Sequence, residues 1–286
     1  MASLPIFQGP EHQPFQLAGR HNGLALLIHG FPGTPAEMRP LGEVLQQAGW
    51  HVEGMLLPGF GSQITAIGSC RYQDWLAAIG RRLAQLRREH GPTVLVGYSM
   101  GAALAIGVAA ENAPHALVLL APFWRLDAGW RGMLLPILKW AFPHFRPFEK
   151  ADFSDLAVQK TIYSFAPDID LGDPAVQAAI RQLSIPSRVI DELRKAGRYA
   201  SRNASRIGIP VLIVQGAQDT LVKPAHSREL SQRFVGPVQY REVQAGHDLL
   251  HAEGDAWREL TNVIIHFIAP FAPSTPIEHD DGKGRT

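Results

Sequence analysis

Residues 93–103 decide the fold, and they run Thr93-Val-Leu-Val-Gly97-Tyr98-Ser99-Met100-Gly101-Ala102-Ala103. An apolar run leads directly into a serine that has a glycine two residues away on each side, and a segment of small residues follows. This G-x-S-x-G pattern predicts a sharp strand-to-helix turn that lifts the serine hydroxyl clear of the backbone. A helix N-terminus beneath that hydroxyl favours negative charge that develops there. The stretch therefore indicates Ser99 as a nucleophile.

Other parts of the chain carry apolar runs of the same kind. Three of them are nearly continuous: Leu24–Ile28, Leu117–Leu120 and Val211–Val214. A continuous run is typical of a strand that is covered on both faces, as in a parallel sheet. Weaker strand candidates are His51–Leu57, Val238–Val243 and, at an edge, Phe15–Ala18.

Segments with helical periodicity lie between these strands. In Gln73–His90 the apolar residues recur at spacings of three and four, and Gly91-Pro92 ends the helix. Thr34-Pro35-Ala36-Glu37 predicts a capping box at the start of another helix, in which Thr34 and Glu37 satisfy backbone N–H groups reciprocally. The alternation of strand and helix predicts an α/β fold with a mostly parallel central sheet flanked by helices.

The alternation breaks between residues 122 and 206, where aromatic residues are frequent, among them Trp124, Trp130, Trp140, Phe142, Phe145, Phe148 and Phe165. We expect residues 1–121 and 207–272 to form the core, and residues 122–206 to form a mainly helical cap, or lid, inserted into it. The aromatic rings either line an apolar pocket or form the core of the cap itself. Residues 273–286 are expected to be a flexible tail.

The composition excludes several classes of function. The 286 residues carry a net charge of +1, which gives no general attraction to nucleic acid or to an anionic membrane. The one cysteine, Cys70, permits no intrachain disulfide. Because no apolar stretch reaches the length of a membrane span and the first residues show no secretory pattern, we expect a cytoplasmic protein. The oligomeric state, monomer or homodimer, stays open.

The segment His29-Gly30-Phe31-Pro32-Gly33-Thr34-Pro35 follows the first clear strand. Together with the motif around Ser99, it resembles the α/β-hydrolase superfamily, and within it the carboxylesterase and monoacylglycerol-lipase-like branch. The resemblance extends from about Leu24 to Ile268. It implies that the backbone N–H groups of Phe31 and Met100 form an oxyanion hole. It also implies that His29 braces the loop rather than acting as a base.

A serine nucleophile needs a base and an orienting acid, and in this superfamily they follow it in the order acid, then histidine. Asp219 lies in the turn after the strand Val211–Val214, in the G-x-x-D setting of the superfamily. His247 follows a glycine in the loop after the next strand. His226, His251 and Asp248 are weaker candidates on position alone, and Asp127, Asp152 and Asp155 belong to the insertion.

These residues predict a serine hydrolase that cleaves carboxylic esters through an acyl-enzyme intermediate. Ser99, His247 and Asp219 form its catalytic triad, and the substrate is a small ester with an apolar acyl group. No metal ion or organic cofactor is implied. A thioesterase, amidase, lactonase or C–C bond hydrolase on the same scaffold is the main alternative, because fold does not decide among them. A non-catalytic ligand receptor and an acyltransferase are further alternatives.

Overall fold

A computed structural model describes residues 7–125, 144–163, 165–166 and 169–272 of the chain. The predicted flexible tail, 273–286, lies outside the described residues. So do Asp127 and three aromatic residues of the predicted insertion, Trp130, Trp140 and Phe142.

Seven strands form one sheet in the order β1-β3-β2-β4-β5-β8-β9, and all seven coincide with predicted strands. They are β1 (Phe15–Leu17), β2 (Leu24–Ile28), β3 (His51–Met55), β4 (Thr93–Tyr98), β5 (Ala116–Leu120), β8 (Val211–Gly216) and β9 (Val238–Val243). Only β1, at the edge, runs antiparallel to its neighbour, and every other pairing is parallel. The prediction of a mostly parallel sheet is confirmed.

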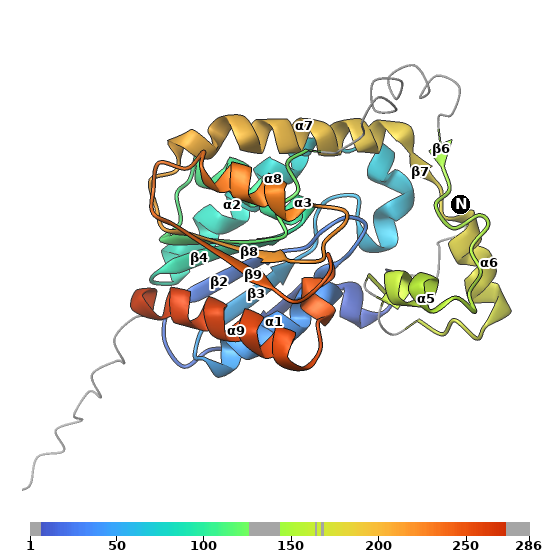
Figure 1. Ribbon diagram of the computed structural model, residues 1–286, viewed down its shortest axis with the longest axis horizontal. Coiled ribbons are helices and arrows are strands. Elements are labelled where there is room, and N and C mark those ends of the chain that lie inside the picture. Colours follow the sequence, from blue (N-terminus) through green and yellow to red (C-terminus); the bar gives the residue numbers. More distant parts are fainter. Residues whose placement is uncertain (1–6, 126–143, 164, 167–168, 273–286) are drawn as a thin grey trace, which may run out of the picture.

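Helices cover both faces of this sheet (Figure 1). One face carries α1 (Pro35–Gln47) and α9 (Gly254–Ile268), and the other carries α2 (Tyr72–Glu89), α3 (Met100–Ala109), α7 (Ser187–Asn203) and α8 (Pro224–Ser231). Short 3-10 helices occur at Pro10–His12, Gly61–Ser69, Ala204–Arg206, Leu249–His251 and Ala269–Phe271.

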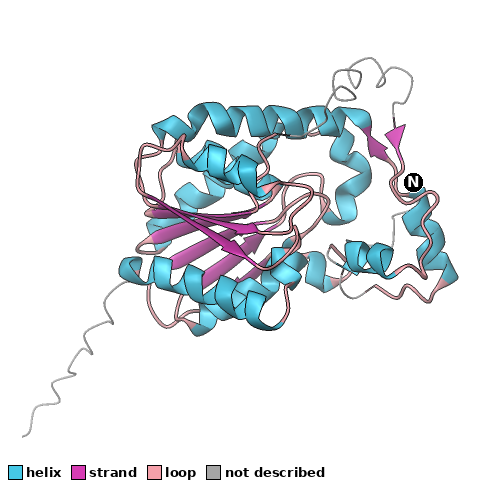
Figure 2. Cartoon of the chain, in the orientation of Figure 1, coloured by secondary structure: helices cyan, strands magenta, loops and turns pink. Residues whose placement is uncertain are grey.

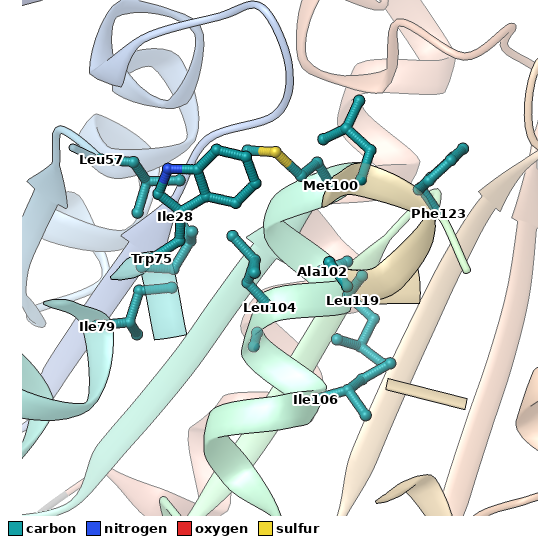
Figure 3. Packing of buried hydrophobic residues seen from close by; sticks show 14 of the residues in the cluster. Ile28, Leu57, Trp75, Ile79, Met100, Ala102, Leu104, Ile106, Leu119 and Phe123 are labelled. Carbon is teal, nitrogen blue, oxygen red and sulfur yellow. The ribbon is translucent and has the colours of Figure 1, made fainter. Parts of the chain in front are cut away.

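The central strands are apolar at successive positions because each face of the sheet has its own core. In β2, Leu24, Leu26 and Ile28 pack in the core under α2 and α3, whereas Ala25 and Leu27 pack against α1 and α9. Side chains alternate between the two faces of a strand, so a strand buried on both sides loses its polar positions. Figure 3 shows the first core, with Trp75 and Ile79 of α2 beside Leu104 of α3.

The described part of residues 122–206 is mainly helical, as predicted, with α5 (Leu156–Tyr163), α6 (Pro174–Gln182) and α7. It also contains two short strands that the sequence pattern did not predict, β6 (His144–Phe145) and β7 (Ile185–Pro186), which form an antiparallel pair. The elements α5, α6, β6 and β7 lie beyond one end of the sheet (Figure 2). In contrast, α7 returns along the sheet and packs against α3.

The start of α1 differs from the predicted capping box. Thr34 is the N-cap, as predicted, but its hydroxyl accepts a hydrogen bond from the N–H of Ala36 rather than from that of Glu37. The predicted role of Glu37 in the box is wrong. The carboxyl group of Glu37 accepts instead from the N–H of Gly30, because the loop after β2 folds over the first turn of α1.

Candidate active site

The turn around Ser99 has the strained geometry that its sequence predicts. Ser99 joins β4 to α3 with φ of 54° and ψ of −113°, a backbone conformation that costs a non-glycine residue energy. The flanking glycines make the turn possible. A Cβ atom on Gly97 would lie 2.4 Å from the carbonyl oxygen of Gly101, and one on Gly101 would lie 2.3 Å from that of Ile28. Both positions therefore exclude a side chain.

The structure brings Ser99, His247 and Asp219 together in one hydrogen-bonded chain. The distance from Ser99 Oγ to His247 Nε2 is 3.0 Å, and that from His247 Nδ1 to Asp219 Oδ2 is 2.8 Å. Each residue follows the carboxyl end of a parallel strand, β4 for Ser99, β8 for Asp219 and β9 for His247. These strand ends lie on the same edge of the sheet, which is where open α/β sheets place their sites.

The side chain of Asp219 is fully buried, and each of its two carboxylate oxygens accepts two hydrogen bonds. Oδ1 accepts from the N–H groups of Leu221 and Val222, both at 2.8 Å, and Oδ2 accepts from Gln215 Nε2 at 2.9 Å as well as from His247. Burial alone would raise the pKa of Asp219, but the hydrogen bond and the charge of His247, together with the hydrogen bonds from Val222 and Gln215, outweigh this effect. The pKa is lowered, so the group stays ionised beside the imidazole.

Two residues that the sequence analysis did not single out hold this chain in place. Gln215 is fixed by Ser227, whose hydroxyl donates to Gln215 Oε1 at 2.6 Å. The hydroxyl of Tyr98 donates to the carbonyl oxygen of His247 at 3.1 Å. Gln215 is the one amide in an otherwise apolar buried strand, and this was the signal that could have identified it.

The residues that were weaker candidates for the acid or the base have other hydrogen-bond partners. Asp248 Oδ1 pairs with His251 Nδ1 at 2.8 Å, so neither of the two takes part in the chain through His247. His226 lies on α8, where its carbonyl oxygen accepts from the indole of Trp124. Asp152 caps the backbone of Ser154 in the insertion.

His29 is fully buried and is fixed at both ring nitrogens. Its Nδ1 donates to the carbonyl oxygen of Gly30 at 2.8 Å, and its Nε2 accepts from the N–H of Leu57 at 3.2 Å. Burial lowers the pKa of His29 to about 4, although the bond to Gly30 opposes this shift. These contacts are those of a neutral residue that braces the loop, as the resemblance implied.

Phe31 and Met100, the residues expected to supply the oxyanion hole, lie close to Ser99. Phe31 lines the same cavity as Ser99, and Met100 is the first residue of α3. N–H groups in the first turn of a helix have no partner within that helix. The N–H of Met100 therefore has no hydrogen-bond partner within α3.

A cavity of about 280 Å³ opens above Ser99 and His247. Its walls are mainly apolar and come from both the core and the insertion. The apolar lining residues are Phe31, Pro32, Phe145, Pro147, Phe148, Phe165, Ile185, Ile190 and Leu221. Apolar walls with a few convergent polar groups are typical of a pocket for a small organic molecule.

Two further observations concern the described residues alone. Their histidine, cysteine, aspartate and glutamate side chains form no cluster that could hold a metal ion. Their helices include none with the length and apolar character that a membrane crossing requires.

The sheet, the turn at Ser99 and the hydrogen-bonded chain through His247 define an α/β-hydrolase fold. Residues 19–253 match the family described as serine aminopeptidase, S33, and the chain belongs to this family. The resemblance inferred from the sequence motifs is thereby confirmed at the level of fold and family.

Lipases and other lipolytic enzymes are among the proteins that are similar to this chain. A thermostable monoacylglycerol lipase from Bacillus sp. (strain H-257) is 33% identical over 108 residues, which are 38% of this chain and 42% of that relative. The chain thus spans less than half of the length of that lipase. A solved structure of the metagenome-derived lipolytic enzymes LipS and LipT superposes with a TM-score of 0.72, at 20% identity, over 91% of this chain and 98% of that one. A monoacylglycerol lipase from Paleococcus ferrophilus gives a TM-score of 0.69, at 20% identity, over 90% and 98%.

Proposed function

We propose that this protein is a serine hydrolase that cleaves carboxylic esters. Ser99 Oγ attacks the ester carbonyl carbon while His247 takes its proton, and His247 then gives that proton to the departing alcohol. A water molecule activated by His247 releases the acid from Ser99. The observation that carries this proposal is the continuous chain from Ser99 through His247 to Asp219 at the floor of the cavity.

The other site residues are assigned the following roles. Asp219 holds the imidazole with Nε2 directed to Ser99 and stabilises the positive charge that forms on it. The N–H groups of Phe31 and Met100 bind the oxyanion of the tetrahedral intermediate. Every step uses groups of the chain and water, with no metal ion or organic cofactor.

The substrate that the cavity fits is a small, uncharged ester with an apolar acyl group. Phe148 and Phe165 of the insertion, together with Leu221 of the core, offer apolar contacts beside the nucleophile. The similarity to a monoacylglycerol lipase supports this substrate class. Thioesters, amides, lactones and C–C bonds are the alternative substrates on this scaffold, and a receptor or an acyltransferase would share the fold.

The division into domains is part of the proposal. Residues 1–121 and 207–272 form the core, and residues 122–206 form the cap over Ser99. The cavity supports it, because Phe145, Ile185 and Ile190 contribute to its walls. A cytoplasmic location is proposed from the composition alone.

A panel of p-nitrophenyl esters, matched thioesters and anilides with acyl groups from acetyl to dodecanoyl tests the reaction class. The proposal expects ester turnover that Ser99→Ala reduces by several powers of ten. Faster turnover of the matched thioester or anilide would favour an alternative. Turnover that Ser99→Ala leaves unchanged would contradict a serine mechanism, and product analysis with added alcohol identifies acyl transfer.

A further inference from the structure

The carboxyl group of Glu37 lies inside the loop that joins β2 to α1, residues 29–34, which we call the oxyanion loop. Its Oε1 accepts a hydrogen bond from the N–H of Gly30, seven residues earlier in the chain. A Cβ atom on Gly33 would lie 2.3 Å from Oε2, so the loop wraps closely around the carboxyl group. Glu37 is 4% exposed. The contact therefore fixes the backbone directly before Phe31.

The same carboxyl group and the nucleophile both lie close to Gly30. A Cβ atom on Gly30 would be 3.3 Å from both Glu37 Oε1 and the Cβ of Ser99, and 3.2 Å from the ring of Tyr98. Glu37 also lines the cavity that contains Ser99 and His247. A charge on Glu37 would therefore be felt where the oxyanion of the reaction forms.

The groups that surround Glu37 favour its neutral form. Burial raises the pKa of Glu37 to about 8, and the carboxylate of Asp248 adds to this shift while the bond to Gly30 opposes it. Tyr98 stays protonated because burial and the nearby carboxyl groups raise its pKa well above its usual range. His29 is neutral because burial lowers its pKa, and its two ring nitrogens are bonded to Gly30 and Leu57. His247 is the remaining titratable group on the cavity wall.

We propose that Glu37 is a positioning residue of the oxyanion loop, which it holds at Gly30 as a neutral acid, and that its ionisation switches the active site off. This inference rests on the proposed hydrolase function. The neutral acid keeps the N–H of Phe31 in place and adds no charge. A carboxylate in the same position repels the negative oxygen that the loop must stabilise, so the barrier to the reaction rises.

Profiles of kcat/KM against pH between 6 and 10, on a p-nitrophenyl ester with Ser99→Ala as the blank, test this role because kcat/KM reports the ionisation of the free enzyme. For the wild type we expect a fall of about tenfold between pH 7 and pH 9. In Glu37→Gln, whose amide oxygen can still accept from Gly30 but carries no charge, this fall is absent. Glu43→Gln, on the exposed side of α1, is the matched control and keeps the wild-type profile.

Glu37→Ala separates positioning from packing. Without an acceptor for the Gly30 N–H, we expect kcat to fall at least about tenfold at pH 7 with little change in KM, because an oxyanion contact acts mainly in the transition state. The proposal is supported if Glu37→Gln keeps part of the wild-type kcat at pH 7 and Glu37→Ala does not. An alkaline fall that persists in Glu37→Gln, or that the wild type lacks, overturns it.

A second readout does not depend on turnover. In protein labelled with ¹³C at the glutamate carboxyl carbon, the resonance that Glu37→Gln removes belongs to Glu37. The proposal expects this resonance to titrate above pH 7, and a midpoint below pH 6 overturns it even where Glu37→Ala fails to fold. If the wild type hydrolyses no ester, the proposed function fails, and the titration still decides whether Glu37 is held neutral.

Discussion

Ser99 Oγ lies 3.0 Å from His247 Nε2, although 148 residues separate the two in the chain. The contact forms because β4 and β9 end at the same edge of the parallel sheet, with Ser99 directly after β4 and His247 in the loop after β9. Asp219 joins them from β8, between the two in chain order. The fold thus assembles from distant segments a site that no one segment carries.

Asp219→Asn is expected to lower kcat by about 10⁴ while the protein stays folded, because an amide nitrogen facing His247 Nδ1 favours the wrong tautomer. Asp248→Asn is the control, since Asp248 is adjacent to His247 but pairs with His251. It should lower kcat by less than about tenfold. Steady-state kinetics on one ester compare the two, and equal losses would contradict the assignment of Asp219.

Gly97→Ala and Gly101→Ala should each lower the free energy of unfolding by about 1–3 kcal/mol or prevent folding, since the new methyl group would overlap backbone atoms. Gly208→Ala is the control, because a Cβ atom there meets nothing within 4 Å. Its effect should stay within about 0.5 kcal/mol. Urea denaturation measures all three, and a tolerated Gly101→Ala would disagree with the tight turn.

Burial of Glu37 makes stability depend on pH. Its pKa is about 8 in the folded protein and about 4.5 when exposed, so the folded state binds more protons between these values. The free energy of unfolding should therefore fall as the pH rises from 5 to 8, by about 3–5 kcal/mol relative to Glu37→Gln. Urea denaturation of both proteins at several pH values measures the difference. A free energy of unfolding of the wild type that, relative to Glu37→Gln, stays constant or rises over this pH range would show that Glu37 is ionised in the folded protein.

Phe148 lines the cavity above Ser99, so its truncation should change acyl-chain preference. Phe148→Ala is expected to lower the ratio of kcat/KM for octanoate over acetate esters by at least about fivefold, because it removes apolar contact that only the longer chain uses. Val235→Ala, at an exposed position outside the cavity lining, should leave the ratio unchanged. An unchanged ratio in Phe148→Ala would place the acyl chain elsewhere.

The sequence predicts those features of the fold that depend on residues close together in the chain. All seven strands of the sheet were predicted. The clearest were β2, β4, β5 and β8, which are buried at every position and are therefore almost continuously apolar. The turn at Ser99 follows in the same way from its neighbouring glycines. The two-residue strands β6 and β7 escaped prediction, since they are too short for any periodicity.

Contacts between distant segments were harder to predict. Glu37 is the third residue of α1, whose N-cap is Thr34, and this local pattern predicts a capping box. The oxyanion loop supplies Gly30 as a competing donor, and this contact depends on how the loop folds over α1. The bond from Tyr98 to His247 likewise joins residues that meet only in the folded chain.

Covalent labelling with a fluorophosphonate probe tests most directly whether Ser99 is an activated nucleophile. With mass spectrometry of peptides from the intact protein, we expect one adduct, located on Ser99, and none in Ser99→Ala. Asp219→Asn should label far more slowly at neutral pH. Equal labelling of the wild type and Ser99→Ala, or no adduct on Ser99 after prolonged exposure, would contradict the proposal that this protein is a serine hydrolase.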